Sequence, residues 1–136
     1  MRNAELIAFD TETTGLDAQK AQLVGLSFAV KAGEAAYIPV AHSYMGVPTQ
    51  LDRDAVLQAL KPILEDPNKA KVGQHAKYDI NILANASTPI QVQGVKFDTM
   101  LESYVLDSTA TRHDMDSLAL KYLDHGTIRF EDIAGK

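Results

Sequence analysis

Two acidic residues, Asp10 and Glu12, stand one residue apart directly after the apolar run 6–9. Side chains alternate across a β-strand, so both carboxylates are expected to leave the same face at the end of a buried central strand. Two like charges this close repel each other, and a divalent cation between them would keep both carboxylates ionised. The pair therefore predicts a site for a hard metal ion. The alternative is a strand end that runs into the polar turn 13–15.

A third acidic residue, Asp79, closes the segment 74–79 in the first turn of a predicted helix. Ile82 and Leu83 follow three and four residues later, which places the Asp79 carboxylate beside the stripe that packs inward. A buried carboxylate needs a hydrogen-bonding partner or a metal ion. The alternative is a partly solvated Asp79 that interacts with the helix dipole. Together with Asp10 and Glu12, Asp79 predicts a three-carboxylate metal site.

The composition is that of an ordinary globular domain. The chain has 136 residues, 46% hydrophobic and 23% charged, and this length fits one domain with a real core. It contains no cysteine, which excludes disulfides and thiolate metal sites. No apolar stretch approaches the roughly 18 residues of a membrane span, and no secretory signal is recognisable. We therefore expect a soluble, cytoplasmic protein without a membrane partner.

The net charge of −5 argues against tight, non-specific binding of duplex DNA, which normally needs a basic face. It does not exclude a metal-dependent nuclease. Two divalent cations would add +4 to the −5 of the chain and bring the total to about −1, with the positive field concentrated where a phosphate must sit.

Hydrophobic periodicity predicts the elements that would position these carboxylates. The turn 31–34 indicates that the second and third strands form an antiparallel hairpin, and Pro39 places the third strand at a sheet edge. Pro62 is expected to kink or shorten the last turn of a helix capped by Asp52. The order of elements predicts a mixed α/β sheet with its first strand central. The predicted strands are 5–9, 22–30, 36–40, 70–73 and 95–97. One predicted helix begins after Asp52, and the others span 76–85, 99–107 and 115–124.

Several other polar residues have structural explanations. Asp98, and Asp114 or Asp116, stand directly before helical patterns and are predicted to be N-caps of the helices that follow them. His42 and His113 are predicted to be hydrogen-bonded or solvent-facing rather than catalytic.

Separated segments of the chain resemble the DEDD 3′–5′ exonucleases, which have a ribonuclease H-like fold. Segment 9–16 resembles the first motif of that family, and segment 74–79 resembles the second. The match extends to the proofreading domains of bacterial family A DNA polymerases, the DNA polymerase I type, and covers nearly the whole chain. The further segments that are similar to these domains are 35–42, 96–104, 112–118 and 128–136.

The resemblance implies an α/β domain, a ribonuclease H-like mixed sheet flanked by helices, over residues 1–136. It also implies that Asp10, Glu12 and Asp79 are catalytic ligands of two divalent ions, Mg²⁺ or Mn²⁺. Two such ions about 4 Å apart can activate a water and stabilise the leaving 3′ oxygen. The implied activity is removal of nucleotides from a single-stranded DNA 3′ end, in proofreading for DNA replication and repair. The implied partners are that DNA end and the polymerase domain of the parent chain.

The resemblance further implies a set of residues that contact the substrate strand. Leu16 and Phe130 match positions that pack against the terminal bases, a contact that grips any base without reading sequence. Taken by themselves, both could be ordinary packing residues, and Tyr78 could be a core aromatic residue. The family commonly has asparagine where His75 stands. The implied substrate-binding residues are Thr11, Leu16, Gln74, His75, Tyr78 and Phe130.

The third family motif is a tyrosine followed four residues later by an aspartate. Neither Tyr104 with Ser108 nor Tyr122 with Gly126 supplies it. We therefore expect the domain to be incomplete at its C-terminus and impaired as it stands. Two other functions remain open: a related 3′–5′ exoribonuclease, and a non-catalytic domain that binds single strands or supports the polymerase.

Overall fold

A computed structural model describes residues 1, 3–109, 112–128 and 132. The chain divides into two compact units, Met1–Asp98 and Thr99–Lys136. Within the described residues, no helix is long and apolar enough to cross a membrane. Along the chain the elements are β1 (Leu6–Thr13), β2 (Leu23–Lys31), β3 (Glu34–Pro39), α1 (Arg53–Leu64), β4 (Ala70–Gly73), α2 (Ala76–Ala84), β5 (Val95–Asp98), α3 (Thr99–Leu106) and α4 (Met115–Leu123).

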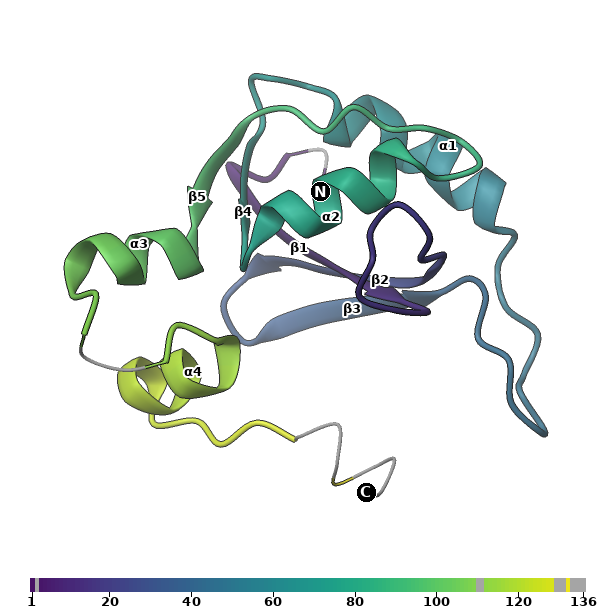
Figure 1. The fold of residues 1–136 in the computed structure, drawn as a ribbon. Helices are drawn as coiled ribbons and strands as arrows, with labels where there is room; N and C mark the ends of the chain where they lie inside the picture. Colours follow the sequence, from purple (N-terminus) through teal and green to yellow (C-terminus); the bar gives the residue numbers. More distant parts are fainter. Residues whose placement is uncertain (2, 110–111, 129–131, 133–136) are drawn as a thin grey trace. The chain divides into compact units, whose positions relative to one another are not determined.

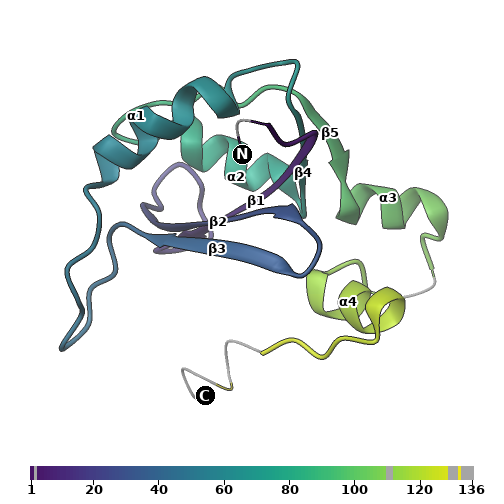
Figure 2. The same ribbon diagram turned by 180° about the vertical axis from the view of Figure 1, so that it is seen from behind.

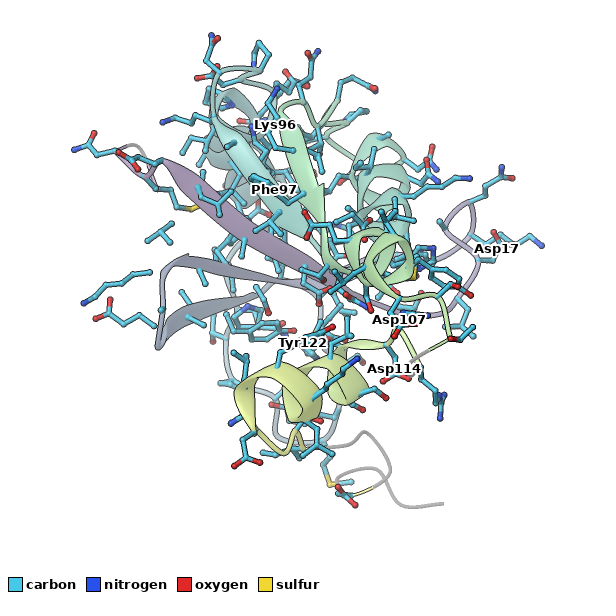
Figure 3. All side chains as sticks on the ribbon, turned by 90° about the vertical axis from the view of Figure 1, so that its left-hand side faces the viewer. Asp17, Lys96, Phe97, Asp107, Asp114 and Tyr122 are labelled. Carbon is cyan, nitrogen blue, oxygen red and sulfur yellow. The ribbon has the colours of Figure 1, made fainter. Side chains whose placement is uncertain are left out.

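The first unit is built on a five-stranded mixed sheet with the strand order β3-β2-β1-β4-β5 (Figure 1). β1 pairs antiparallel with β2 and parallel with β4, so the first strand is central, as predicted. β2 and β3 form the predicted antiparallel hairpin, and β3 lies at the edge of the sheet, where the missing N–H of Pro39 is tolerated. β5, whose Lys96 and Phe97 are labelled in Figure 3, is the other edge.

Helices α1 and α2 lie on the same side of this sheet (Figures 1 and 2). Along β1, Ile7 and Phe9 are buried and belong to the same core cluster as the inward faces of both helices. Ile82 and Leu83 of α2 pack into this core, as their spacing predicted. The other buried members are Leu23, Leu26, Phe28, Val40, Leu57, Leu60, Leu64 and Ile90.

The end of β1 departs furthest from its predicted position, and the other predicted bounds lie within two residues of those observed. β1 does not end at residue 9 but runs to Thr13, because its antiparallel pairing with β2 continues as far as Thr13 opposite Leu23. Asp10 and Glu12 therefore lie within the strand. Helix α1 begins behind the predicted cap, with the Asp52 side chain accepting from Ala55 N at 2.8 Å. It continues past Pro62 to Leu64, so the proline does not shorten it.

The second unit contains α3 and α4. Asp114 is the N-cap of α4, as predicted, and its side chain accepts from Ser117 N at 2.8 Å. His113 is hydrogen-bonded through both ring nitrogens, to Ser103 Oγ at 2.8 Å and to Ser108 O at 3.2 Å. These contacts confirm that His113 is a hydrogen-bonded histidine.

Candidate active site

The site begins where β1 continues beyond the end of β4. β1 and β4 pair only over Leu6–Ala8, opposite Ala70–Val72. The chain then leaves the sheet and starts α2, so the carboxyl half of β1 has no strand partner on this edge. In α/β sheets, ligands bind in the crevice at the carboxyl ends of such strands.

Asp79, in the first turn of α2, occupies the edge that β4 leaves open. Its Oδ1 accepts hydrogen bonds from the backbone N of Thr11 at 2.9 Å and from Thr11 Oγ1 at 2.6 Å. The carboxylate thus satisfies a backbone N–H that a neighbouring strand would otherwise bind. Asp79 is only 3% exposed, so the prediction of an inward-facing carboxylate is confirmed and the partly solvated alternative is wrong.

The three carboxylates influence one another electrostatically. The pKa of Asp10 is raised from 3.8 to about 6, first by burial and then by the charges of Asp79 and Glu12. Burial also raises the pKa of Asp79, although the hydrogen bonds from Thr11 offset part of that rise. The structure therefore brings the three predicted acidic residues into one neighbourhood in which their charges repel.

The oxygen donors and the mutual repulsion fit a hard divalent cation. Yet within residues 1, 3–109, 112–128 and 132, no three His, Asp or Glu side chains are gathered closely enough to hold a metal ion. One oxygen of Asp79 is already held by Thr11, while the Glu12 side chain is exposed. The donor set fits such an ion in chemistry, and side-chain reorientation is needed for the carboxylates to converge on it.

The start of α2 is held by an aspartate from another strand. His75 adopts a left-handed backbone conformation, with φ 57°, and its side chain does not cap the helix. The Asp98 carboxylate, at the end of β5, accepts hydrogen bonds from the backbone N of His75 at 3.1 Å and of Ala76 at 2.9 Å. Sequence reasoning predicted a cap of the following helix and missed this contact. It depends on the parallel pairing of β4 with β5, which sets Gly73 opposite Asp98.

Tyr78 connects α2 to the loop that follows β1. Its hydroxyl lies 2.6 Å from Thr13 Oγ1 and donates to the carbonyl of Gly15. The next residue, Leu16, is 96% exposed, so the alternative that Leu16 is an ordinary packing residue is wrong. Asp17, labelled in Figure 3, closes the loop by accepting from Gln19 N through its side chain. Tyr78 packs against the core with its ring and fastens the Leu16 loop with its hydroxyl.

These residues surround an open pocket of about 370 Å³. Every predicted substrate-binding residue in the described part of the chain lines it, together with two of the three acidic residues. Glu12 is not part of the lining, and Phe130 lies outside the described residues. The lining residues are Asp10, Thr11, Leu16, Gln74, His75, Tyr78 and Asp79.

Comparison with known proteins identifies the family. The sequence model of a 3′–5′ exonuclease family matches residues 1–136. The chain is 82% identical over 136 residues to DNA polymerase I of Pseudomonas aeruginosa, covering 100% of this chain and 15% of that protein. The chain therefore spans about 15% of the length of this curated relative.

Solved structures at lower identity confirm the ribonuclease H-like α/β fold. Brucella melitensis NrnC with bound Mg²⁺ has a TM-score of 0.68 and 19% identity, over 93% of this chain and 57% of that chain. Escherichia coli RNase D, an exoribonuclease involved in structured RNA processing, has a TM-score of 0.66 and 19% identity, over 97% of this chain and 31% of that chain. Because the family model matches residues 1–136 and the chain is 82% identical to the Pseudomonas protein, this chain belongs to the 3′–5′ exonuclease family carried by DNA polymerase I.

Proposed function

We propose that this domain, residues 1–136 of the chain, acts as part of a DNA polymerase and removes nucleotides from single-stranded DNA 3′ ends by metal-dependent hydrolysis. The observation that carries the proposal is the raised pKa of Asp10, caused by burial and by Asp79 and Glu12, at the wall of an open pocket. Clustered carboxylates with perturbed pKa values are typical of functional sites. A domain without catalysis has no physical need for this repulsion. This activity would remove misincorporated nucleotides for the polymerase, in the cytoplasm.

Asp10, Glu12 and Asp79 would hold two divalent ions, Mg²⁺ or Mn²⁺. When bound, such ions supply an activated water and stabilise the leaving 3′ oxygen. The residues of this chain supply the frame. Thr11 fixes one oxygen of Asp79 through two hydrogen bonds, and Asp98 fixes the first turn of α2 that carries Asp79.

The remaining pocket residues would bind the DNA strand. Leu16 presents an exposed apolar side chain beside the carboxylates, and such a group can pack against any terminal base. Tyr78 holds the loop that carries Leu16, so it would set the position of that contact. Gln74, His75 and Thr11 line the same pocket and would contact the strand there. Phe130 would add a second apolar contact.

The test is degradation of a single-stranded DNA with a free 3′ end by the full-length polymerase that carries this domain. We expect shortening from the 3′ end with Mg²⁺, none with a chelator, and loss of at least about 10²-fold in the Asp10→Ala variant. Glu34→Gln is the matched control, because Glu34 is an exposed carboxylate at the start of β3 that is paired with Lys31. Unchanged degradation in Asp10→Ala would contradict the proposal.

A related exoribonuclease is the second candidate, since RNase D shares the fold. Matched DNA and RNA strands of the same sequence separate the two candidates in the same assay. We expect faster shortening of the DNA strand. Faster shortening of RNA would favour the exoribonuclease, and no shortening of either strand would favour a non-catalytic domain that binds single strands or supports the polymerase.

A further inference from the structure

Tyr37 lies on the same face of the sheet as Asp10 and Glu12. Ser27 pairs with Asp10 on one side and with Tyr37 on the other, so these three residues form a row across β1, β2 and β3. The adjacent row starts with Glu12, which pairs directly with Gly25. Side chains in such cross-strand rows share one face and reach their diagonal neighbours.

The ring of Tyr37 leans from its own row across Gly25 toward Glu12. A Cβ built at Gly25 would lie 1.9 Å from Tyr37 Oη and 2.4 Å from its Cζ. The absence of a side chain at Gly25 is therefore what makes room for the phenol. Because Gly25 is the direct partner of Glu12, the Tyr37 hydroxyl lies beside the one acidic residue of the site that does not line the pocket.

The position of this hydroxyl is fixed from the other side by His42. Tyr37 Oη lies 2.5 Å from His42 Nε2, and the two rings meet edge to face with centroids 5.7 Å apart. His42 is itself anchored by Gln50, whose side-chain amide bonds both the backbone N and the backbone O of His42 at 2.8 Å. His42 and Gln50 thus hold the Tyr37 hydroxyl in place at the surface of the sheet.

Of the three acidic residues of the site, Glu12 has the least restricted side chain. It is exposed, and no hydrogen bond or ion pair reaches its carboxylate from the part of the chain that the structure describes. Fixing a free glutamate side chain costs conformational entropy, because the side chain loses rotamer freedom. The pKa of Tyr37 is raised by burial and then by the charge of Glu12, so the phenol lies within electrostatic reach of that carboxylate. A phenol hydroxyl can act as a hydrogen-bond donor.

We infer that Tyr37, oriented by His42, is a positioning residue that restricts the Glu12 carboxylate to the orientation required by the hydrolytic site. The phenol can accept a hydrogen bond from His42 and donate one to Glu12 at the same time. Tyr37 acts through Glu12 and has no contact with the reacting atoms. The inference rests on the proposed exonuclease activity and adds a residue to its machinery.

The test compares Tyr37→Phe, Gly25→Ala and the double variant in the full-length polymerase. Tyr37→Phe removes the hydroxyl and keeps the ring, and we expect kcat for 3′-end hydrolysis to fall about 10-fold, with a higher Mg²⁺ requirement and an unchanged KM for DNA. Gly25→Ala displaces the ring, which can swing away, and should cause a similar loss. Because both changes act on one contact, the double variant should lose little more than either single variant.

Tyr44→Phe is the matched control. The Tyr44 ring also meets the His42 ring edge to face, with centroids 6.5 Å apart, but in the described part of the chain Tyr44 forms no hydrogen bond with His42. The activity of Tyr44→Phe should equal that of the wild type. Thermal unfolding of each variant shows whether it folds, and Tyr37→Phe decides the question if Gly25→Ala does not fold. Wild-type kcat and Mg²⁺ dependence in Tyr37→Phe would overturn the inference, as would a change confined to KM.

A second readout separates this inference from the proposed function. Titration with Mn²⁺ in the absence of DNA measures the carboxylate site directly, and Tyr37→Phe should weaken Mn²⁺ binding about 10-fold, whereas Tyr44→Phe should not. An active wild type with unaltered Mn²⁺ binding in Tyr37→Phe would overturn the role of Tyr37 alone. A wild type that neither binds Mn²⁺ nor degrades DNA would overturn both proposals.

Discussion

The polar residues on the two faces of β1 differ in whether they have bonding partners. On the core side, Thr11 is buried and gives both its backbone N–H and its hydroxyl to Asp79. On the other side, Asp10 and Glu12 form no ion pair with a lysine or arginine among the described residues. Side chains alternate between the two faces of a strand. Thr11 therefore stabilises the fold through hydrogen bonds on one face, whereas Asp10 and Glu12 place mutually repelling carboxylates on the other.

Asp79 belongs to both sides of this comparison. Its hydrogen bonds from Thr11 tie α2 to β1, while its charge raises the pKa of Asp10. Removing Asp79 should therefore damage the fold and the chemistry together, whereas removing the charge of Asp10 should damage only the chemistry.

The largest effect should come from Asp10→Asn. It removes a carboxylate from the proposed metal site and keeps the shape of the side chain, so we expect 3′-end hydrolysis to fall by at least about 10²–10³-fold. The melting temperature should not fall, since the change also removes repulsion from Asp79 and Glu12. Nuclease assays and thermal unfolding of the same preparation check both parts. A variant that loses activity because it unfolds would contradict the division between the two faces.

Asp79→Ala should reduce stability as well as activity. It leaves the buried N–H and hydroxyl of Thr11 without their acceptor, and unsatisfied buried donors of this kind cost about 1–3 kcal/mol. Denaturant unfolding measures the loss in free energy. Glu102→Ala is the matched control, because Glu102 is an exposed acidic residue in the first turn of α3. Equal stability of Asp79→Ala and the wild type would show that the Thr11 contacts carry no net energy.

The metal-free protein should lose stability as the pH rises through the titration of Asp10. Its folded pKa of about 6 lies above the ordinary 3.8, so the folded state holds this proton more tightly than the unfolded state. The stabilisation from this proton is complete below about pH 4 and lost above about pH 6. After discounting for solvent screening, we expect about 1–2 kcal/mol.

Thermal unfolding with a chelator at pH 4.5, 6 and 7.5 checks this slope against Asp10→Asn. The variant lacks the titrating group, so its advantage over the wild type should grow with pH. Added Mg²⁺ should flatten the wild-type curve, because a bound cation favours the ionised carboxylate. Parallel curves for the two proteins would contradict the assignment of the slope to Asp10.

Periodicity predicted the helices and strands closely. The spacing of the acidic residues predicted the three-carboxylate site, and the resemblance to a known family implied the role of each residue. The contacts that position them were not predictable in the same way. Asp98 reaches the start of α2 only because β5 pairs with β4, and the Tyr37 ring lies over Gly25, the strand partner of Glu12, only through the pairing of three strands. Such contacts join residues far apart in the sequence, and local patterns carry no information about pairing partners.

The smallest effect should come from His75, which tests whether a pocket residue acts through its backbone. His75 has φ 57°, a left-handed conformation that histidine and asparagine tolerate better than most residues. This shared tolerance explains how histidine can stand where the resemblance implies asparagine. We expect His75→Asn to change the free energy of unfolding by less than about 0.5 kcal/mol, and His75→Val to lower it by about 1–2 kcal/mol through backbone strain. Denaturant unfolding measures both variants, and Asp98 should hold the first turn of α2 in each, since it binds backbone N–H groups. If His75→Asn were as destabilising as His75→Val, the imidazole side chain, rather than the backbone conformation, would be what this position requires.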